Sequence, residues 1–310
     1  MIISASRRTD IPAFYSDWFI ERLKQGYVCV KNPINPKQIS KINLNKEYVE
    51  CIVFWTKNAK PMMDKLSIIE EMGYPYYFQY TINPYGEDLE KALQNKIEIM
   101  DNFIELSKRI GKDRIVWRYD PIILTEDYTI DYHIEKFEEY CAALAQYTNR
   151  VVISFVDIYK RTEKNVRGVI QSEIDLKIME QLAEEFGKIA DDYEIELQTC
   201  SEKISLEKYG IRHTACIDRK IIEKIVGYEI KDKKDRNQRE LCGCLPSIDI
   251  GAYDTCPYGC LYCYASTNEE KTKHNIESHK KESELLVGEI TPEDKVTERK
   301  IENLKEKQED

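Results

Sequence analysis

The sequence predicts an α/β fold, specifically a TIM-like or partial (β/α) barrel. Short runs rich in Ile, Val, Phe and Tyr alternate with longer amphipathic stretches from residue 2 to residue 200, which is the pattern of successive βαβ units and a parallel sheet. About six such units follow one another, and this favours a barrel or an open partial barrel over two small domains. A chain of 310 residues is long enough to bury the core of such a unit.

The individual elements follow from periodicity and from turn residues. Segments rich in β-branched and aromatic side chains predict strands at residues 2–6, 50–55, 76–82, 114–119, 150–155 and 194–199, with a minor strand or a connection at 28–30. Apolar residues at helical spacing predict helices that begin near Trp18 and continue at 63–72, 89–110, 133–147 and 173–191. Gly111 is expected to end the third of these helices, since glycine commonly follows the last helical residue.

Composition changes along the C-terminal part of the chain. Residues 231–240 are rich in Lys, Asp and Arg, and the sequence from Thr267 onward is mostly Glu, Lys, Asn and Ser; both compositions are typical of solvated segments. A charged helix is expected from about Pro292 to Lys307, either solvated or bound to a partner. The expected divisions are a barrel, a cysteine-rich segment packed on the barrel mouth and a charged extension, at residues 1–230, 231–266 and 267–310 respectively.

The overall balance of residues narrows the function classes. Hydrophobic residues make up 42% of the chain and charged residues 33%, with a net charge of -10. A nonspecific nucleic-acid binder depends on Lys and Arg to neutralise phosphates, so this acidic balance disfavours that class. No apolar run approaches a membrane span, and the N-terminus lacks the apolar region of a signal peptide, so we expect a cytoplasmic protein. Ten cysteines in such a chain indicate metal ligands and buried thiols rather than disulfides.

Polar residues follow every predicted strand. The carboxyl ends of parallel strands meet at one rim, where barrel active sites lie, so we expect one mouth lined by Arg7, Asp10, Lys57, Asn58, Asn83, Arg118, Asp120, Ser154, Asp157 and Glu202. Arginine and lysine there would suit a carboxylate or phosphate, and an aspartate could hold a ribose hydroxyl or an amine. For each residue the alternative is a helix cap, a turn or a salt bridge. The candidate catalytic residues are Lys57, Arg118, Asp120 and Asp157, and the candidate cofactor-binding residues are Arg7, Asp10, Asn83, Glu202 and Tyr262.

The loop Cys256-Pro-Tyr-Gly-Cys260-Leu-Tyr-Cys263 carries the clearest chemical signal. Three cysteines at C-x₃-C-x₂-C spacing can place three thiolates around one face of a metal cluster. A [4Fe–4S] cluster usually takes four cysteines, so three leave one iron open to a small molecule. The alternative is a structural zinc site completed by a further ligand, because zinc accepts Cys₄ and Cys₃His sets.

A second set of cysteines could also bind metal. Cys200 follows a predicted strand, Cys216 follows His213 by three residues, and Cys242 and Cys244 form a C-x-C pair. Four thiolates of this kind could hold a second iron–sulfur cluster or a zinc ion, unless Cys200 and Cys216 are simply buried thiols. Packing is the expected role of the remaining three cysteines, which are Cys29, Cys51 and Cys141. The sequence contains no serine-hydrolase elbow, Walker A loop or Rossmann glycine fingerprint, so hydrolase and NTPase classes are unsupported.

The stretch from Asp254 to Ala265, with Tyr262 just before the last cysteine, resembles the signature loop of the radical S-adenosylmethionine (radical SAM) enzymes. The resemblance implies that the open iron binds the amino and carboxylate groups of SAM. It also implies that a reductant such as flavodoxin or ferredoxin gives the cluster one electron. The reduced cluster then passes this electron to SAM and breaks a carbon–sulfur bond of SAM. The product would be a 5′-deoxyadenosyl radical that acts on a small-molecule substrate of unknown identity.

Over most of its length the chain resembles the DUF1848 family of uncharacterised bacterial proteins, in the segments Ser6–Ala13, Phe54–Asn58, Arg118–Pro121, Thr199–Glu202 and Cys242–Ala265. That family is noted for a C-terminal cysteine group similar to the one that begins radical SAM domains. In typical radical SAM proteins the loop follows the first strand of the barrel, whereas here it follows the last predicted strand. A circular permutation would reconcile the two if Ser247–Gly251 forms a strand beside the N-terminal strand.

Other function classes fit parts of the pattern. One alternative is a non-catalytic zinc or iron–sulfur protein whose barrel binds a ligand, with the metal contributing to folding. A second is a nucleic-acid-modifying radical SAM enzyme similar to spore photoproduct lyase, which the segment Thr56-Lys57-Asn58 faintly resembles. A third is an electron-transfer or scaffold protein that binds a partner through its charged tail.

Overall fold

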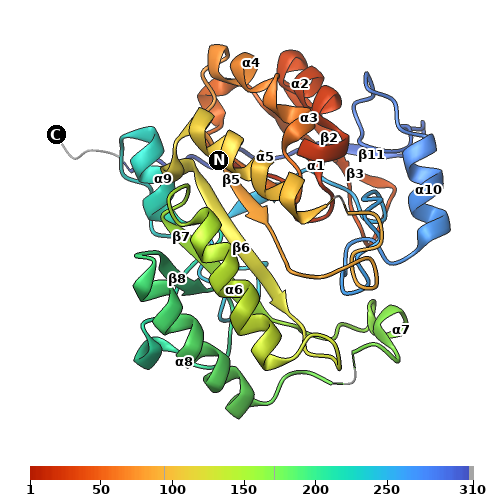
Figure 1. Ribbon diagram of the computed structural model, residues 1–310. Coiled ribbons are helices and arrows are strands. Elements are labelled where there is room, and N and C mark those ends of the chain that lie inside the picture. Colours follow the sequence, from red (N-terminus) through yellow and green to blue (C-terminus); the bar gives the residue numbers. More distant parts are fainter. Residues whose placement is uncertain (94, 171, 307–310) are drawn as a thin grey trace.

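A parallel sheet lies at the centre of the molecule. A computed structural model of the chain describes residues 1–93, 95–170 and 172–306. The central sheet has eight strands, and each hydrogen-bonded pair of neighbours in it is parallel (Figure 1). In sheet order the strands are β10 (Ser247–Asp249), β1 (Ile2–Ala5), β4 (Cys51–Thr56), β5 (Tyr76–Thr81), β6 (Ile115–Ile122), β7 (Arg150–Phe155), β8 (Glu196–Thr199) and β9 (Arg212–His213).

The two faces of this sheet pack against different parts of the chain. Side chains alternate between the faces along a strand, so Ile52 and Phe54 of β4 join one buried cluster while Cys51 and Val53 join another. The larger cluster contains the apolar sides of α2 (Ser16–Gln25), α4 (Leu66–Glu71), α5 (Lys96–Ile110), α6 (Ile130–Leu144) and α8 (Leu176–Asp192). The smaller cluster contains apolar residues of α9 (Arg219–Val226) and, besides Cys51, the four cysteines Cys200, Cys216, Cys242 and Cys244, so the C-terminal part of the chain covers this second face.

Local signals set the ends of the helices. The side chain of Asn95 accepts a hydrogen bond from the backbone N–H of Ile97 at 2.9 Å and caps α5, as short polar residues commonly do. Gly26 ends α2 with a φ of 75°, a conformation that favours glycine. The shorter helices are α1 (Ile11–Phe14), α3 (Lys60–Met63), α7 (Glu163–Val166) and α10 (Glu269–Glu277), and the 3₁₀ turns are η1 (Lys46–Tyr48), η2 (Lys112–Arg114) and η3 (Glu207–Tyr209).

The C-terminal residues differ from the expectation. They form a strand, β11 (Lys295–Glu298), which pairs in parallel with β3 (Gln38–Asn43); β3 in turn pairs with β2 (Tyr27–Lys31) in a separate three-stranded sheet. The prediction of a helix from Pro292 to Lys307 is therefore wrong: residues 292–306 contain β11 and no helix, and Lys307 lies outside the described residues. In β11 the backbone of this charged segment forms hydrogen bonds with β3. The periodicity of apolar residues in the sequence cannot predict such a pairing with a distant strand.

The strands predicted at 2–6, 50–55, 76–82, 114–119, 150–155 and 194–199 are confirmed as β1, β4, β5, β6, β7 and β8. The strand expected within Ser247–Gly251 is β10, and its pairing with β1 places Ile2 opposite Ser247, as the circular permutation requires. Among the described strands, β9 and β10 end the hydrogen-bonded sheet, so what is observed is an open parallel sheet with helices packed on it. Within the described residues no helix has the length and apolar character needed to cross a membrane.

Candidate functional site

The Cys256–Cys263 loop follows β10, at the carboxyl end of that strand. Backbone hydrogen bonds hold it against residues 89–92: the N–H of Leu261 donates to the carbonyl of Leu89 at 3.0 Å, and the N–H of Ala92 donates to the carbonyl of Tyr258 at 3.0 Å. Between these contacts Glu90 and Cys260 form an antiparallel bridge. The loop is thus fixed by main-chain contacts to a segment more than 160 residues earlier in the chain.

The three thiols of this loop differ in their exposure to solvent. Cys260 is buried, while Cys256 and Cys263 are partly exposed, so an approach for a further ligand remains. Burial raises the pKa of the Cys260 thiol to about 12 against the opposing effect of Lys57, and burial also raises the pKa of Cys256. Without metal the thiols of Cys256 and Cys260 are neutral at pH 7, and a bound metal would displace their protons. The N–H of Ala265 already donates to the sulfur of Cys263 at 3.4 Å.

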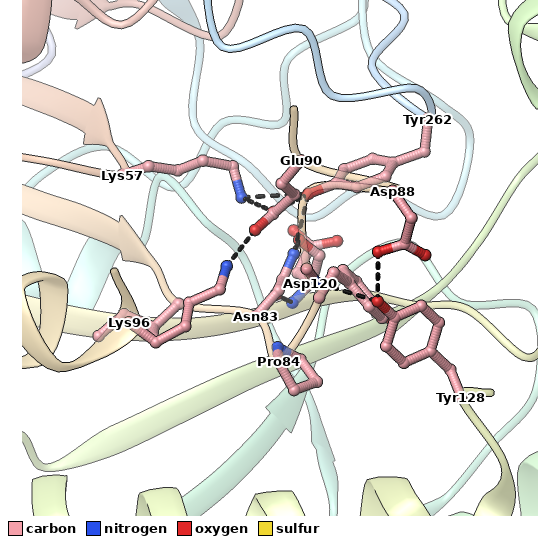
Figure 2. A network of polar contacts seen from close by, with 12 residues as sticks. Lys57, Asn83, Pro84, Asp88, Glu90, Lys96, Asp120, Tyr128 and Tyr262 are labelled. Carbon is pink, nitrogen blue, oxygen red and sulfur yellow. Dashed lines mark hydrogen bonds and ion pairs between the residues drawn. The ribbon is translucent and has the colours of Figure 1, made fainter. Parts of the chain in front are cut away.

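A compact polar network lies directly beside the loop (Figure 2). The ammonium group of Lys57 donates to the Glu90 carboxylate at 2.6 Å and to the hydroxyl of Tyr262 at 3.1 Å. Lys96 forms an ion pair with the other carboxylate oxygen of Glu90, and Tyr262 donates its hydroxyl proton to the same carboxylate. Glu90, from the turn before α5, is therefore the centre of a group that includes a residue of the cysteine loop.

The charges in this network favour an anion at the loop. The Glu90 side chain has no solvent exposure. Burial alone would raise its pKa, but Lys57 and Lys96 hold the pKa below its usual value, so Glu90 is ionised. Two ammonium groups around one carboxylate give the group a net charge of +1. Within this group Lys57 lowers the pKa of the Cys260 thiol and Glu90 raises it, so Lys57 is the charge that would stabilise a thiolate there.

The network continues into the sheet through Asn83 and Asp120. Asn83 donates its amide hydrogens to the Tyr262 hydroxyl at 3.1 Å and to the backbone carbonyl of Asp120 at 2.9 Å, and it accepts from the Asp120 N–H at 2.8 Å. The Asp120 carboxylate forms an ion pair with Arg118 and accepts a hydrogen bond from Ser154. Arg118 in turn donates to the sulfur of Cys216 at 3.0 Å, so hydrogen bonds connect the loop to the second set of cysteines.

The second set of cysteines is buried and tightly grouped. The sulfur atoms of Cys200, Cys242 and Cys244 all lie within 4.8 Å of one another. The side chain of Cys216 interacts with those of Cys200 and Cys244, and these contacts are the main cause of the lowered pKa of Cys216. Among the described residues this is the single group of three or more Cys, His, Asp or Glu whose ligand atoms come so close together. It could hold a metal ion.

Two arginines flank a tryptophan next to this set. The guanidinium carbons of Arg7 and Arg118 lie 4.9 Å and 5.3 Å from the ring centre of Trp55, within the range of cation–π attraction. Asp249, at the end of β10, holds Arg7 by accepting its backbone N–H at 2.8 Å. The Arg7 Nη2 atom is buried and has no hydrogen-bond partner within the described part of the chain.

Comparison with known proteins places the chain in a family. A family model described as "Domain of unknown function (DUF1848)" matches residues 2–265, a range that contains both cysteine sets. The chain belongs to the DUF1848 family. No curated protein matches it. A solved structure described as a "putative alpha-L-fucosidase" from Bacteroides thetaiotaomicron VPI-5482 is 10% identical, covers 76% of this chain and 86% of its own, and has a TM-score of 0.27, which is too low to support an inference.

Several residues expected at the mouth of this DUF1848 protein do come together. Lys57, Asn83, Asp120, Arg118 and Tyr262 form one continuous set of contacts. Glu202 lies close by: its carboxylate accepts the N–H of Phe155 at 3.0 Å, and burial, reinforced by Asp157 and Asp120, raises its pKa to about 7.

Other predicted residues have structural roles in the DUF1848 fold. Asp10 caps α1 and accepts hydrogen bonds from Ala13, Thr56 and Lys57, which is the helix-cap alternative. The side chain of Asn58 accepts the N–H of Lys60 at 2.9 Å. Asp157 is exposed and forms an ion pair with Arg239 at the surface.

Glu90 and Lys96 are functional candidates that sequence reasoning missed. Residues 89–110 had been predicted as one helix, which hides Glu90 on a helical surface, but α5 begins only at Lys96. Asn95 was an available signal, since an asparagine at that position is a common helix cap. Residues 89–92, which precede it, pair with the cysteine loop.

Proposed function

We propose that this DUF1848 protein is a radical SAM-like iron–sulfur enzyme whose [4Fe–4S] cluster is held by Cys256, Cys260 and Cys263. The observation that carries the proposal is the position of the three-thiol loop at the carboxyl end of a parallel strand, against a buried polar network with net positive charge. When bound and reduced, such a cluster supplies one electron to the sulfonium of SAM, which separates into methionine and a 5′-deoxyadenosyl radical.

The residues around the loop suit this group. Three cysteines leave one iron without a protein ligand, and the partial exposure of Cys256 and Cys263 leaves room for a small molecule at that position. Lys57 and Lys96 offset negative charge on the thiolates, since each feels the charge of Cys260. The Ala265 N–H donates to the Cys263 sulfur, and such hydrogen bonds help to set a cluster's potential.

The polar network has an orienting role in this proposal. Tyr262 is anchored by Lys57, Glu90 and Asn83, so the last turn of the loop cannot shift without breaking buried hydrogen bonds. Arg118 and Asp120 are two residues apart on β6, so their side chains lie on the same face of the sheet. Trp55 of β4 lies on that face too, because the Arg118 guanidinium lies over its ring. They are the residues we propose to contact substrate.

The test is anaerobic reconstitution of the full chain with iron and sulfide, followed by dithionite and SAM. We expect about four irons at the loop, an EPR signal of the reduced protein that changes when SAM is added, and release of 5′-deoxyadenosine. Cys260→Ala should abolish all three. Cys29→Ala, which removes a buried thiol from β2 outside both cysteine sets, should leave them unchanged.

Two outcomes would count against the enzyme. A loop that binds zinc even under anaerobic conditions, with no spectral response to SAM, would mean that metal only staples this segment to the sheet. A four-iron cluster whose EPR signal is insensitive to SAM would instead indicate electron transfer.

A further inference from the structure

We propose that Cys200, Cys216, Cys242 and Cys244 form a closed site for a single zinc ion, separate from the loop site, that joins the two ends of the open sheet. This proposal does not depend on the radical SAM proposal, because none of its ligands belongs to the Cys256–Cys263 loop. It assigns a different metal, a different coordination and a different role to the second set of cysteines.

The spacing of the sulfur atoms selects a single ion. Tetrahedral zinc with Zn–S bonds of about 2.3 Å places its sulfur ligands about 3.8 Å from one another. The sulfurs of Cys200, Cys242 and Cys244, all within 4.8 Å of one another, match this arrangement. A [4Fe–4S] cluster places a core of iron and sulfide between its thiolates and therefore separates them further.

Cys216 is the fourth ligand in this proposal: its sulfur lies beside the group but is not within 4.8 Å of all three other sulfurs, so it would move toward the ion on binding. Its side chain contacts those of Cys200 and Cys244, and Cys200 also contacts Cys242 and Cys244. All four thiols are buried, so no position is left open for a substrate or a water molecule. A Cys₄ set without an open position is typical of structural zinc. Binding replaces four thiol protons by one Zn²⁺, and the four thiolates with the ion carry a net charge of −2.

The surrounding charges fit a dianionic centre. Arg118 donates a hydrogen bond to the Cys216 sulfur at 3.0 Å. Arg7 also lies near the set, since negative charge on Cys244 and Cys216 would stabilise its guanidinium cation. The Arg7 Nη2 atom is buried without a hydrogen-bond partner among the described residues. Arg118 already forms an ion pair with Asp120, whereas the unpartnered Nη2 atom of Arg7 would gain an anionic neighbour in a centre of charge −2.

The topology gives the site its role. Cys200 directly follows β8, near one end of the sheet, while Cys244 lies just before β10, at the opposite end. The two ends share no strand pairing among the described strands. Hydrogen bonds between these segments include Leu245 N–H to the carbonyl of Ile217, Ile217 N–H to the Cys244 sulfur at 3.4 Å, and His213 Nε2 with the carbonyl of Leu241 at 2.9 Å. Four zinc–thiolate bonds would fasten β10 to β8. Because β10 leads into the Cys256–Cys263 loop, the zinc would also support the position of that loop.

The experiment uses the full chain with Cys256, Cys260 and Cys263 all changed to Ser, which removes every loop ligand. Metal and sulfide analysis of this triple variant should give one zinc per chain and no acid-labile sulfide. X-ray absorption at the zinc edge should show four sulfur neighbours at about 2.3 Å. Since SAM is not used, failure of the radical SAM proposal would leave this result unaffected.

Single ligand changes then test each cysteine. Cys216→Ser in the triple variant should lose zinc and lower the Tm, whereas Cys29→Ala in the same background should retain one zinc per chain. Metal content of the parent triple variant stands even if a ligand variant fails to fold. Iron with acid-labile sulfide in the triple variant would overturn the proposal, as would a zinc-free triple variant with the Tm of the zinc-loaded wild type.

Discussion

The ion pairs of Glu90 allow a quantitative test of the network beside the loop. Glu90→Gln preserves the shape of the side chain but removes the only carboxylate between Lys57 and Lys96 in that group. Removing one partner of a fully buried pair typically costs about 3–5 kcal/mol, because the other charge stays buried and unpaired. The lysines retain 14% and 21% exposure and can reach water in part, so we expect a loss of about 3 kcal/mol.

This loss can be measured by urea unfolding or by calorimetry. With an unfolding entropy of about 2.1 cal/mol/K per residue, about 3 kcal/mol lowers the Tm of this 310-residue chain by about 5 °C. Glu87→Gln is the matched control, since Glu87 is exposed three residues earlier and its change should stay within about 0.5 kcal/mol. Lys96→Met combined with Glu90→Gln should recover part of the loss, because it removes one of the two stranded charges.

The pH dependence of the same pair has a definite sign. Lys57 and Lys96 hold the pKa of Glu90 below its usual value of 4.5. The contribution of Glu90 to stability is therefore complete above pH 4.5 and is lost as pH falls through the lower pKa of the folded state. The reasoning would be refuted if Glu90→Gln unfolds like the wild type at pH 7, or if the Lys96 and Glu90 changes are simply additive.

Three further predictions concern other parts of the fold. Burial lowers the pKa of His133 to about 4, so the contribution of His133 to stability should be constant above pH 6.5 and fall by up to about 3 kcal/mol as pH drops from 6.5 to 4, which the difference between wild type and His133→Gln in urea unfolding at several pH values would show. Gly251→Ala should cost about 1–3 kcal/mol, measured by Tm, because the new Cβ would lie 2.1 Å from the Ser6 hydroxyl oxygen. Arg118→Met should speed zinc loss to a chelator, because it removes the donor to the Cys216 sulfur.

Each of these has its own contradicting result. His133→Gln should flatten the pH profile between 4 and 6.5, and an unchanged profile would assign the effect to another group. Gly243→Ala, whose new Cβ would meet its nearest atom at an ordinary 3.7 Å, should be close to neutral; equal losses at both glycines would contradict the steric argument. If Arg118→Met releases zinc at the wild-type rate, the hydrogen bond from Arg118 to Cys216 does not stabilise the metal site.

Local pattern was sufficient for much of the fold. The strands β1, β4, β5, β6 and β7 appear where β-branched and aromatic residues cluster, since a buried parallel strand requires such side chains over its whole length. Chain direction then determined which ends of the strands meet, and this is why Lys57, Asn83, Arg118 and Asp120 could be grouped before their contacts were known.

Sequence by itself also determined the spacing of Cys256, Cys260 and Cys263, on which the proposed cluster depends, because that spacing is a property of the chain alone. Only the tertiary structure decided what surrounds that loop. Glu90 reaches it through pairing between residues about 170 positions apart, and Cys200 reaches Cys244 from the other end of the sheet. Such contacts depend on which surfaces meet after the strands have assembled, and local periodicity carries no information about them.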